Sequence, residues 1–152
     1  MDLKDRITST LKDALKSKDS VAVSTLRMVN AAIKDHEIVL RGEGKTPEVS
    51  EADVIAILGK MVKQRQESAK AYRDGGRAEL AAGEEAEIGV LETFLPRQLD
   101  DAETAAAIDA AIAETGAETI RDMGKVMGVL KSEHAGQLDM GKVGGLVKGK
   151  LG

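Results

Sequence analysis

Apolar side chains in this sequence recur every three or four residues, and nowhere do they alternate with polar ones over a strand-length run. The first such segment, 3–18, carries Leu3, Ile7, Leu11, Ala14 and Leu15. A repeat of about 3.6 residues places these side chains on one face of a helix, whereas a strand needs a repeat of two. The spacing therefore predicts an all-α protein.

The composition supports the same fold class. The 152 residues include no Trp, one Tyr (Tyr72) and one Phe (Phe94), so Ala, Leu, Val, Ile and Met supply nearly all the apolar volume. Richness in Ala, Leu, Glu and Lys favours helix throughout. Cysteine is absent, which excludes disulfides, thiolate nucleophiles and cysteine metal sites.

Four helical segments are predicted before Pro96, at about 3–18, 20–40, 50–74 and 77–95. Ser50 followed by Asp53 has the spacing of a capping box at the start of the third segment. Three more segments follow, the first of them opened by Asp100 with Glu103 and ended by Gly116. We therefore expect a four-helix N-terminal domain (1–95), a linker (96–100) and a small three-helix C-terminal domain (101–152).

The segment 121–131, RDMGKVMGVLK, reads as helix although it contains two glycines four residues apart. Each glycine inside a helix costs about 1 kcal/mol relative to alanine. At 100° per residue the apolar side chains of this segment share one face, while Gly124 and Gly128 lie on another, edged by Lys131 on one side and by Arg121 and Lys125 on the other. Exposed backbone lets a bulky partner approach, and the cations favour a polyanion.

The last predicted helix, 139–151, repeats this arrangement. Gly141, Gly145 and Gly149 share one arc, with Lys142 and Lys148 beside them. Residues 119–152 carry six Lys or Arg against three Asp or Glu, whereas the preceding residues hold 16 against 23. Any anionic partner is therefore expected at the C-terminal end. The alternative, that small residues four apart let two helices of one protein cross closely, stays open.

Several segments resemble one known family. They are DMGKVMGVLK (122–131), the G-x-x-D motif at Gly136–Asp139, LVKGKL (146–151), STLRMVNAAIKDHEI (24–38), VKQRQES (62–68) and ETFLPRQL (92–99). Together they cover nearly the whole chain and are similar to the GatB/YqeY family. This family comprises stand-alone YqeY proteins and the C-terminal tail of the B subunit of the tRNA-dependent amidotransferase.

The resemblance implies a helical fold of two parts. It also implies a tail that helps to hold the body of a tRNA, with Gly124–Lys125 and Met127–Gly128 in the tRNA-facing or tail-packing motif. The family is associated with carbon–nitrogen ligase activity that uses glutamine as amide donor, but this chain lacks the catalytic domain of the B subunit. Many relatives have a basic residue after the glycine of G-x-x-D, where this sequence has Gln137.

No catalytic constellation is visible in the sequence. His36 and His134 lie far apart, and the acids of 79–92 read as a solvated helix face, so we expect no catalytic residue, metal or cofactor. His36 falls on an apolar stripe, as a core or boundary histidine does. Arg65 also falls on an apolar face and needs a buried carboxylate or carbonyl partner, Glu92 being one candidate.

The two aromatic side chains leave little scope for stacking on bases, so RNA binding would use phosphates and folded shape. Our first hypothesis is a non-catalytic module that binds structured RNA, tRNA above all, through Arg121, Gly124, Lys125, Gly128, Lys131, Lys142 and Lys148. The alternative is an adaptor that docks on an amidotransferase or another protein. The N-terminus lacks a signal-peptide pattern and no segment resembles a membrane span, so we expect no membrane partner and a cytoplasmic location.

Overall fold

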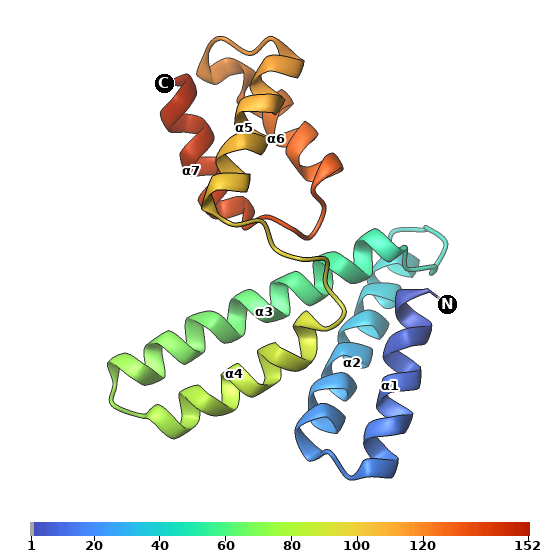
Figure 1. Ribbon diagram of the computed structural model, residues 1–152. Helices are drawn as coiled ribbons and strands as arrows, with labels where there is room; N and C mark the ends of the chain where they lie inside the picture. Colours follow the sequence, from blue (N-terminus) through green and yellow to red (C-terminus); the bar gives the residue numbers. More distant parts are fainter. Residues whose placement is uncertain (1) are drawn as a thin grey trace. The chain divides into compact units, whose positions relative to one another are not determined.

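Seven α-helices and one short 3-10 helix make up the regular structure of residues 2–152, the part of the chain that the computed structural model describes (Figure 1). No strand occurs within these residues, so the all-α prediction is confirmed. By their internal contacts the helices group into two units, one ending at Leu95 and one running from Pro96 to Gly152.

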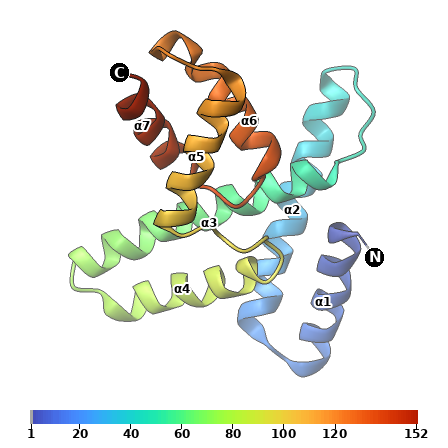
Figure 2. The same cartoon turned by 45° about the horizontal axis from the view of Figure 1, so that its top comes forward.

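The N-terminal unit consists of two helical hairpins (Figures 1 and 2). Its helices are α1 (Leu3–Ser17), α2 (Ser20–Gly42), α3 (Glu51–Asp74) and α4 (Ala78–Glu92). The core is aliphatic apart from Phe94, and all four helices or their ends contribute to it. Its buried members are Leu3, Ile7, Leu26, Val29, Ile33, Val54, Leu58, Met61, Val62, Leu91 and Phe94.

Local signals account for most helix ends in this unit. Ser50 and Asp53 form the predicted capping box, each side chain accepting from the other residue's backbone N–H. The fourth helix ends earlier than expected, at Glu92. The amides of Phe94 and Leu95 make turn bonds of 3.1 Å before Pro96, which disfavours helical geometry in the residue that precedes it.

Arg65 is buried in this unit, as predicted, but its partner differs from the suggested Glu92. Its Nε lies 3.2 Å from Oε2 of Glu87 on α4, and its Nη1 donates to the carbonyl of Met61 at 3.2 Å. Glu92 lies five residues after Glu87, about 140° further around the helix, so the two carboxylates cannot face Arg65 together. Glu92 is exposed.

The C-terminal unit is a three-helix cluster, with its helices side by side in both views (Figures 1 and 2). It contains α5 (Asp101–Thr115), the 3-10 helix η1 (Ile120–Asp122), α6 (Met123–Glu133) and α7 (Met140–Leu151). Asp100 and Glu103 form the predicted capping box, and Gly116 ends α5 with φ 65°. The buried side chains are Ile108, Ala111, Val126, Leu130, Val143 and Val147.

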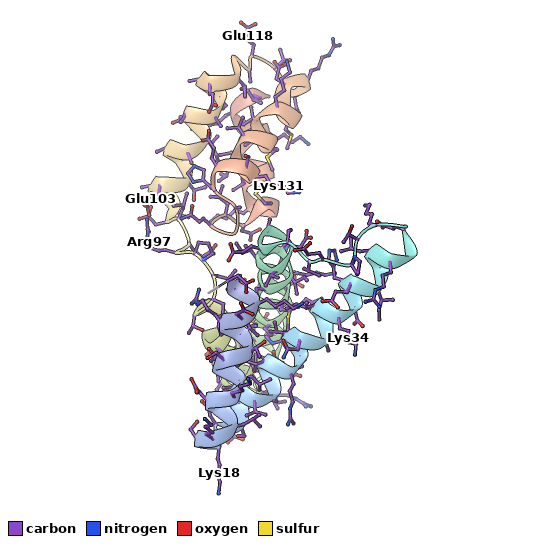
Figure 3. The ribbon with its side chains drawn as sticks, turned by 90° about the vertical axis from the view of Figure 1, so that its right-hand side faces the viewer. Lys18, Lys34, Arg97, Glu103, Glu118 and Lys131 are labelled. Carbon is purple, nitrogen blue, oxygen red and sulfur yellow. The ribbon has the colours of Figure 1, made fainter. Side chains whose placement is uncertain are left out.

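The segment expected to be a linker, 96–100, is hydrogen-bonded to the loop between α6 and α7. Leu99 N donates to the carbonyl of Gln137 at 3.0 Å, and Gln137 Nε2 donates to the carbonyl of Arg97 at 3.0 Å. Arg97 also holds Glu103 through two hydrogen bonds, of 2.8 and 2.6 Å (Figure 3). These bonds attach the segment to the C-terminal unit.

We predict that Arg97→Ala loosens this attachment in a pH-dependent way. The Arg97 guanidinium and the Asp100 amide lower the pKa of Glu103 to about 2, from 4.5. A carboxyl with a lowered pKa stabilises the fold above its ordinary pKa, and this contribution is lost as the pH falls from about 4.5 to about 2. Hydrogen-exchange protection of the Leu99 amide should fall in Arg97→Ala and show a weaker pH dependence.

The matched control is Arg121→Ala, which removes an exposed arginine of the same unit that has no ion pair within residues 2–152. It should leave the Leu99 amide as protected as in the unmodified protein. Equal protection in both variants over the whole pH range would contradict the attachment.

Candidate RNA-binding face of the C-terminal unit

The glycines of α6 are uncovered. Gly124 and Gly128 are both exposed, and a Cβ built on either would meet no atom of the described residues within 4 Å. The core side chains Val126 and Leu130 lie on the opposite side of the helix. Within the C-terminal unit, no helix therefore packs against these two glycines.

Three exposed cations border these glycines. Arg121, Lys125 and Lys131 belong to η1 and α6, and none of them makes an ion pair within residues 2–152. Figure 3 labels Lys131 on α6. We call the surface formed by Arg121, Gly124, Lys125, Gly128 and Lys131 the glycine face of α6.

The cations of α7 differ in their surroundings. Lys142 Nζ lies 3.0 Å from Oδ1 of Asp101, and Lys150 binds Asp109, so both lysines pair with acids of α5. Lys148 is exposed and has no ion pair within the described part of the chain. Lys142 is thus held by the fold, whereas Lys148 is accessible to a partner.

The close helix contact in this unit occurs at Gly144, a residue that the sequence analysis did not single out. A Cβ placed there would lie 3.7 Å from the methyl of Met123 and 3.9 Å from that of Met127, both on α6. Gly141, Gly145 and Gly149, which form the predicted arc of α7, are exposed. One sign of this contact is present in the sequence. It is the doublet Gly144–Gly145, whose first glycine directly follows the core residue Val143.

A groove between α5 and α6 borders the glycine face and carries negative charge. It is lined by Glu114, Thr115, Lys125, Gly128, Val129, Ser132 and Glu133. The charge of Glu133 and its hydrogen bond with Glu114 raise the pKa of the Glu114 carboxyl. Two carboxylates this close disfavour a phosphate on the α5 side of Gly128.

The net charge of the whole C-terminal unit differs from that of its last 34 residues, 119–152. Residues 119–152 have an excess of three positive charges, but residues 96–152 hold seven Lys or Arg against nine Asp or Glu, a formal charge of −2. The difference comes from α5, whose acids pack beside α7 and neutralise two of its lysines. Within the described residues of this unit, the unpaired positive charge is thereby confined to the glycine face and Lys148.

Gln137 cannot easily serve as a phosphate ligand. Its side-chain amide donates to the carbonyl of Arg97 at 3.0 Å, and its backbone carbonyl accepts from Leu99. The residue therefore holds the segment before α5.

Three of the residues considered for chemistry lie beside a side chain of opposite charge type in the N-terminal unit. His36 is half-buried at the boundary of the N-terminal unit, with Nε2 3.5 Å from Oδ2 of Asp53. Of the acids on α4, Glu85 and Glu87 bind arginines of α3. Within residues 2–152 no group of three or more His, Cys, Asp or Glu side chains could hold a metal, and no helix is long and apolar enough to cross a membrane.

We predict that Gly124→Ala and Gly128→Ala each stabilise the C-terminal unit by about 0.5–1 kcal/mol. Alanine favours a helix by this amount over glycine, and the added methyl meets no neighbour among the described residues. Urea unfolding followed by circular dichroism measures the effect. Gly116→Ala is the control and should destabilise the unit, because Gly116 has φ 65°. Loss of stability in the α6 variants would show that the glycine face is covered.

Comparison with known proteins finds one family model that matches nearly the whole chain and several relatives that match a little over half of it. The sequence model of a family described as "Yqey-like protein" matches residues 4–151. "Altered inheritance of mitochondria protein 41, mitochondrial" is 32% identical over 85 residues in Vanderwaltozyma polyspora and 39% identical over 85 residues in Meyerozyma guilliermondii. Each match covers 56% of this chain, and 44% and 42% of the respective relatives, so the matched region spans less than half of those proteins.

An uncharacterised protein of Schizosaccharomyces pombe is 31% identical over 90 residues, 59% of this chain and 69% of that protein. The resemblance drawn from the sequence motifs is thereby confirmed at the level of the family. The expected cytoplasmic location is wrong by this comparison, because the matching relatives from Vanderwaltozyma polyspora, Meyerozyma guilliermondii and Clavispora lusitaniae are named as mitochondrial proteins.

Proposed function

Because this chain belongs to the YqeY-like protein family, we propose that its C-terminal unit binds structured RNA, and tRNA in particular, as a non-catalytic module. The observation that carries the proposal is the glycine face of α6, where exposed backbone at Gly124 and Gly128 adjoins three cations that have no ion pair within residues 2–152. The likeness of this segment to the tail of the amidotransferase B subunit supports the choice of tRNA.

The chemistry of the unit favours contact with phosphates rather than with bases. Residues 96–152 contain no Phe, Tyr or Trp, and their one ring outside proline, His134, is half-buried, so the unit offers little surface for base stacking. Arg and Lys side chains bind phosphates of any sequence, and their arrangement on a rigid surface selects the shape of the RNA. A folded RNA with a regular backbone, such as the body of a tRNA, suits such a surface.

The glycines contribute by their lack of side chains. The backbone N–H of Gly128 lies inside α6 and serves its helical hydrogen bonds, so it is not a phosphate ligand. Without a Cβ, however, the sugar–phosphate ridge of an RNA can approach the helix surface closely. Arg121 and Lys125 then reach its phosphates from one side and Lys131 from the other.

We predict that the double variant Lys125→Glu/Lys131→Glu binds tRNA at least about tenfold more weakly than the unmodified protein. Each reversal replaces attraction with repulsion, and each phosphate that the variant no longer neutralises should lower the salt slope of log K by about one. Fluorescence anisotropy with labelled tRNA over a salt series measures both quantities. In the same assay Gly124→Ala/Gly128→Ala should also weaken binding, although it stabilises the helix.

The matched control is Lys63→Glu/Lys70→Glu, which changes net charge equally through exposed lysines of α3 in the N-terminal unit. It should weaken binding much less, since only the general attraction is reduced. Equal reductions in affinity in both double variants would contradict a site on α6.

A second candidate function, an adaptor that docks on an amidotransferase subunit or another protein, is favoured by the groove between α5 and α6. Its carboxylates, Glu114 and Glu133, repel RNA but suit a cationic side chain of a protein partner.

We predict that Glu133→Gln separates the two functions. If the unit binds RNA, removing this charge should tighten tRNA binding severalfold. If it is an adaptor, the variant should lose its protein partner in a pull-down, and nuclease treatment should not release that partner from the unmodified protein. Weaker tRNA binding by Glu133→Gln would contradict the RNA proposal, whereas release of the partner by nuclease would contradict the adaptor.

A further inference from the structure

Met28, on α2 of the N-terminal unit, combines an exposed side chain with a contact to a buried charge. Its sulfur lies 3.5 Å from Nη2 of Arg65, and 48% of the residue is exposed to solvent. The other methionines among residues 2–152 are less accessible, since Met61 is buried and those of the C-terminal unit are half-buried. Met28 is therefore the most exposed methionine among these residues, and we expect an oxidant in solution to reach its side chain first.

The guanidinium beneath it lacks one strong acceptor. Only 7% of Arg65 is exposed, and its Nε and Nη1 bind Glu87 and the carbonyl of Met61. The partner of Nη2 is the thioether sulfur, a weak acceptor. A buried donor that has only a weak partner costs free energy, which a stronger acceptor at the same place would recover.

We infer that Met28 is a site of reversible oxidation by peroxides, and that the resulting sulfoxide is held by Arg65. A lone pair of the sulfur attacks one oxygen of hydrogen peroxide, so an S–O bond forms and the O–O bond breaks. Sulfur is oxidised by two electrons, and the departing oxygen takes up the second peroxide proton to leave as water. The sulfoxide oxygen is a strong acceptor beside Nη2.

The sulfoxide of Met28 stabilises the protein, whereas oxidation of most methionines in a protein core destabilises it. A sulfoxide inside an apolar core disrupts packing, because a polar group is buried without partners. At Met28 the oxygen has both solvent and the Arg65 guanidinium within reach. Its hydrogen bond adds a link between α2 and α3, so oxidation of Met28 stabilises the N-terminal unit. The inference concerns this unit alone and does not depend on RNA binding.

The first test is the order of oxidation. The full-length protein is treated with graded hydrogen peroxide, and each methionine-containing peptide is quantified by mass spectrometry. Met28 should be oxidised first and Met61 last among the methionines at positions 2–152, and methionine sulfoxide reductase should restore Met28. Oxidation of Met28 no faster than that of Met123, Met127 and Met140 would overturn the inference.

The second test is stability. Mild peroxide treatment that oxidises Met28 alone should raise the thermal midpoint of the N-terminal unit and shift the side-chain nitrogen resonances of Arg65. Met28→Leu removes the sulfur, so peroxide should change neither quantity in that variant. An unchanged or lowered midpoint in the unmodified protein, or the same shift in Met28→Leu, would overturn the role of Arg65.

Met28→Gln tests the hydrogen bond without an oxidant. The amide oxygen of glutamine and the oxygen of methionine sulfoxide are the same number of bonds away from the backbone, so both can accept from Arg65. This variant should be more stable than Met28→Leu, although glutamine is the less apolar side chain. The reverse order of stability would contradict the proposed acceptor.

Discussion

A buried guanidinium must have hydrogen-bond partners, and this requirement at Arg65 ties together three helices of the N-terminal unit. Glu87 from α4, the Met61 carbonyl of α3 itself and the Met28 sulfur of α2 surround it. Leaving a buried charge without its partner costs about 3–5 kcal/mol, more than most single apolar contacts contribute. An aliphatic core permits several helix registers, whereas this ion pair specifies one between α3 and α4.

The part of the fold that could be read from the sequence is the part that local interactions determine. Ser50 with Asp53 and Asp100 with Glu103 satisfy helix-end N–H groups within three residues, so pattern and outcome agree. The partner of Arg65 could not be read in this way. To choose Glu87 rather than Glu92, one must know the register of α4 against α3. That register depends on how the two helices pack, which helical spacing within either segment does not determine.

The candidate site was predictable to the same extent. Helical spacing alone places Arg121, Lys125 and Lys131 around the glycines of α6, and the structure leaves them exposed there. The charge of the surroundings, however, depends on which helix packs alongside. Because α5 packs beside α7, Asp101 forms an ion pair with Lys142 and Asp109 forms one with Lys150. A count of charged residues along the sequence cannot predict these pairs. The glycine that does bring two helices close, Gly144, is likewise identified only by its neighbours on α6.

Both units contain exposed cations without an ion pair and helical glycines that no described residue covers, but Gly83 and Gly89 of α4 lie among acids in the sequence, whereas the glycines of α6 lie among cations. In the N-terminal unit Arg65, Arg73 and Lys4 all bind carboxylates of neighbouring helices, so the fold accounts for them. In α6 of the C-terminal unit, two glycines lower helix stability by about 1 kcal/mol each, and no described residue packs against them in return. Beside them lie three cations that form no ion pair in the described part of the chain. Neither feature helps the unit to fold, and the RNA binding that we propose would use both.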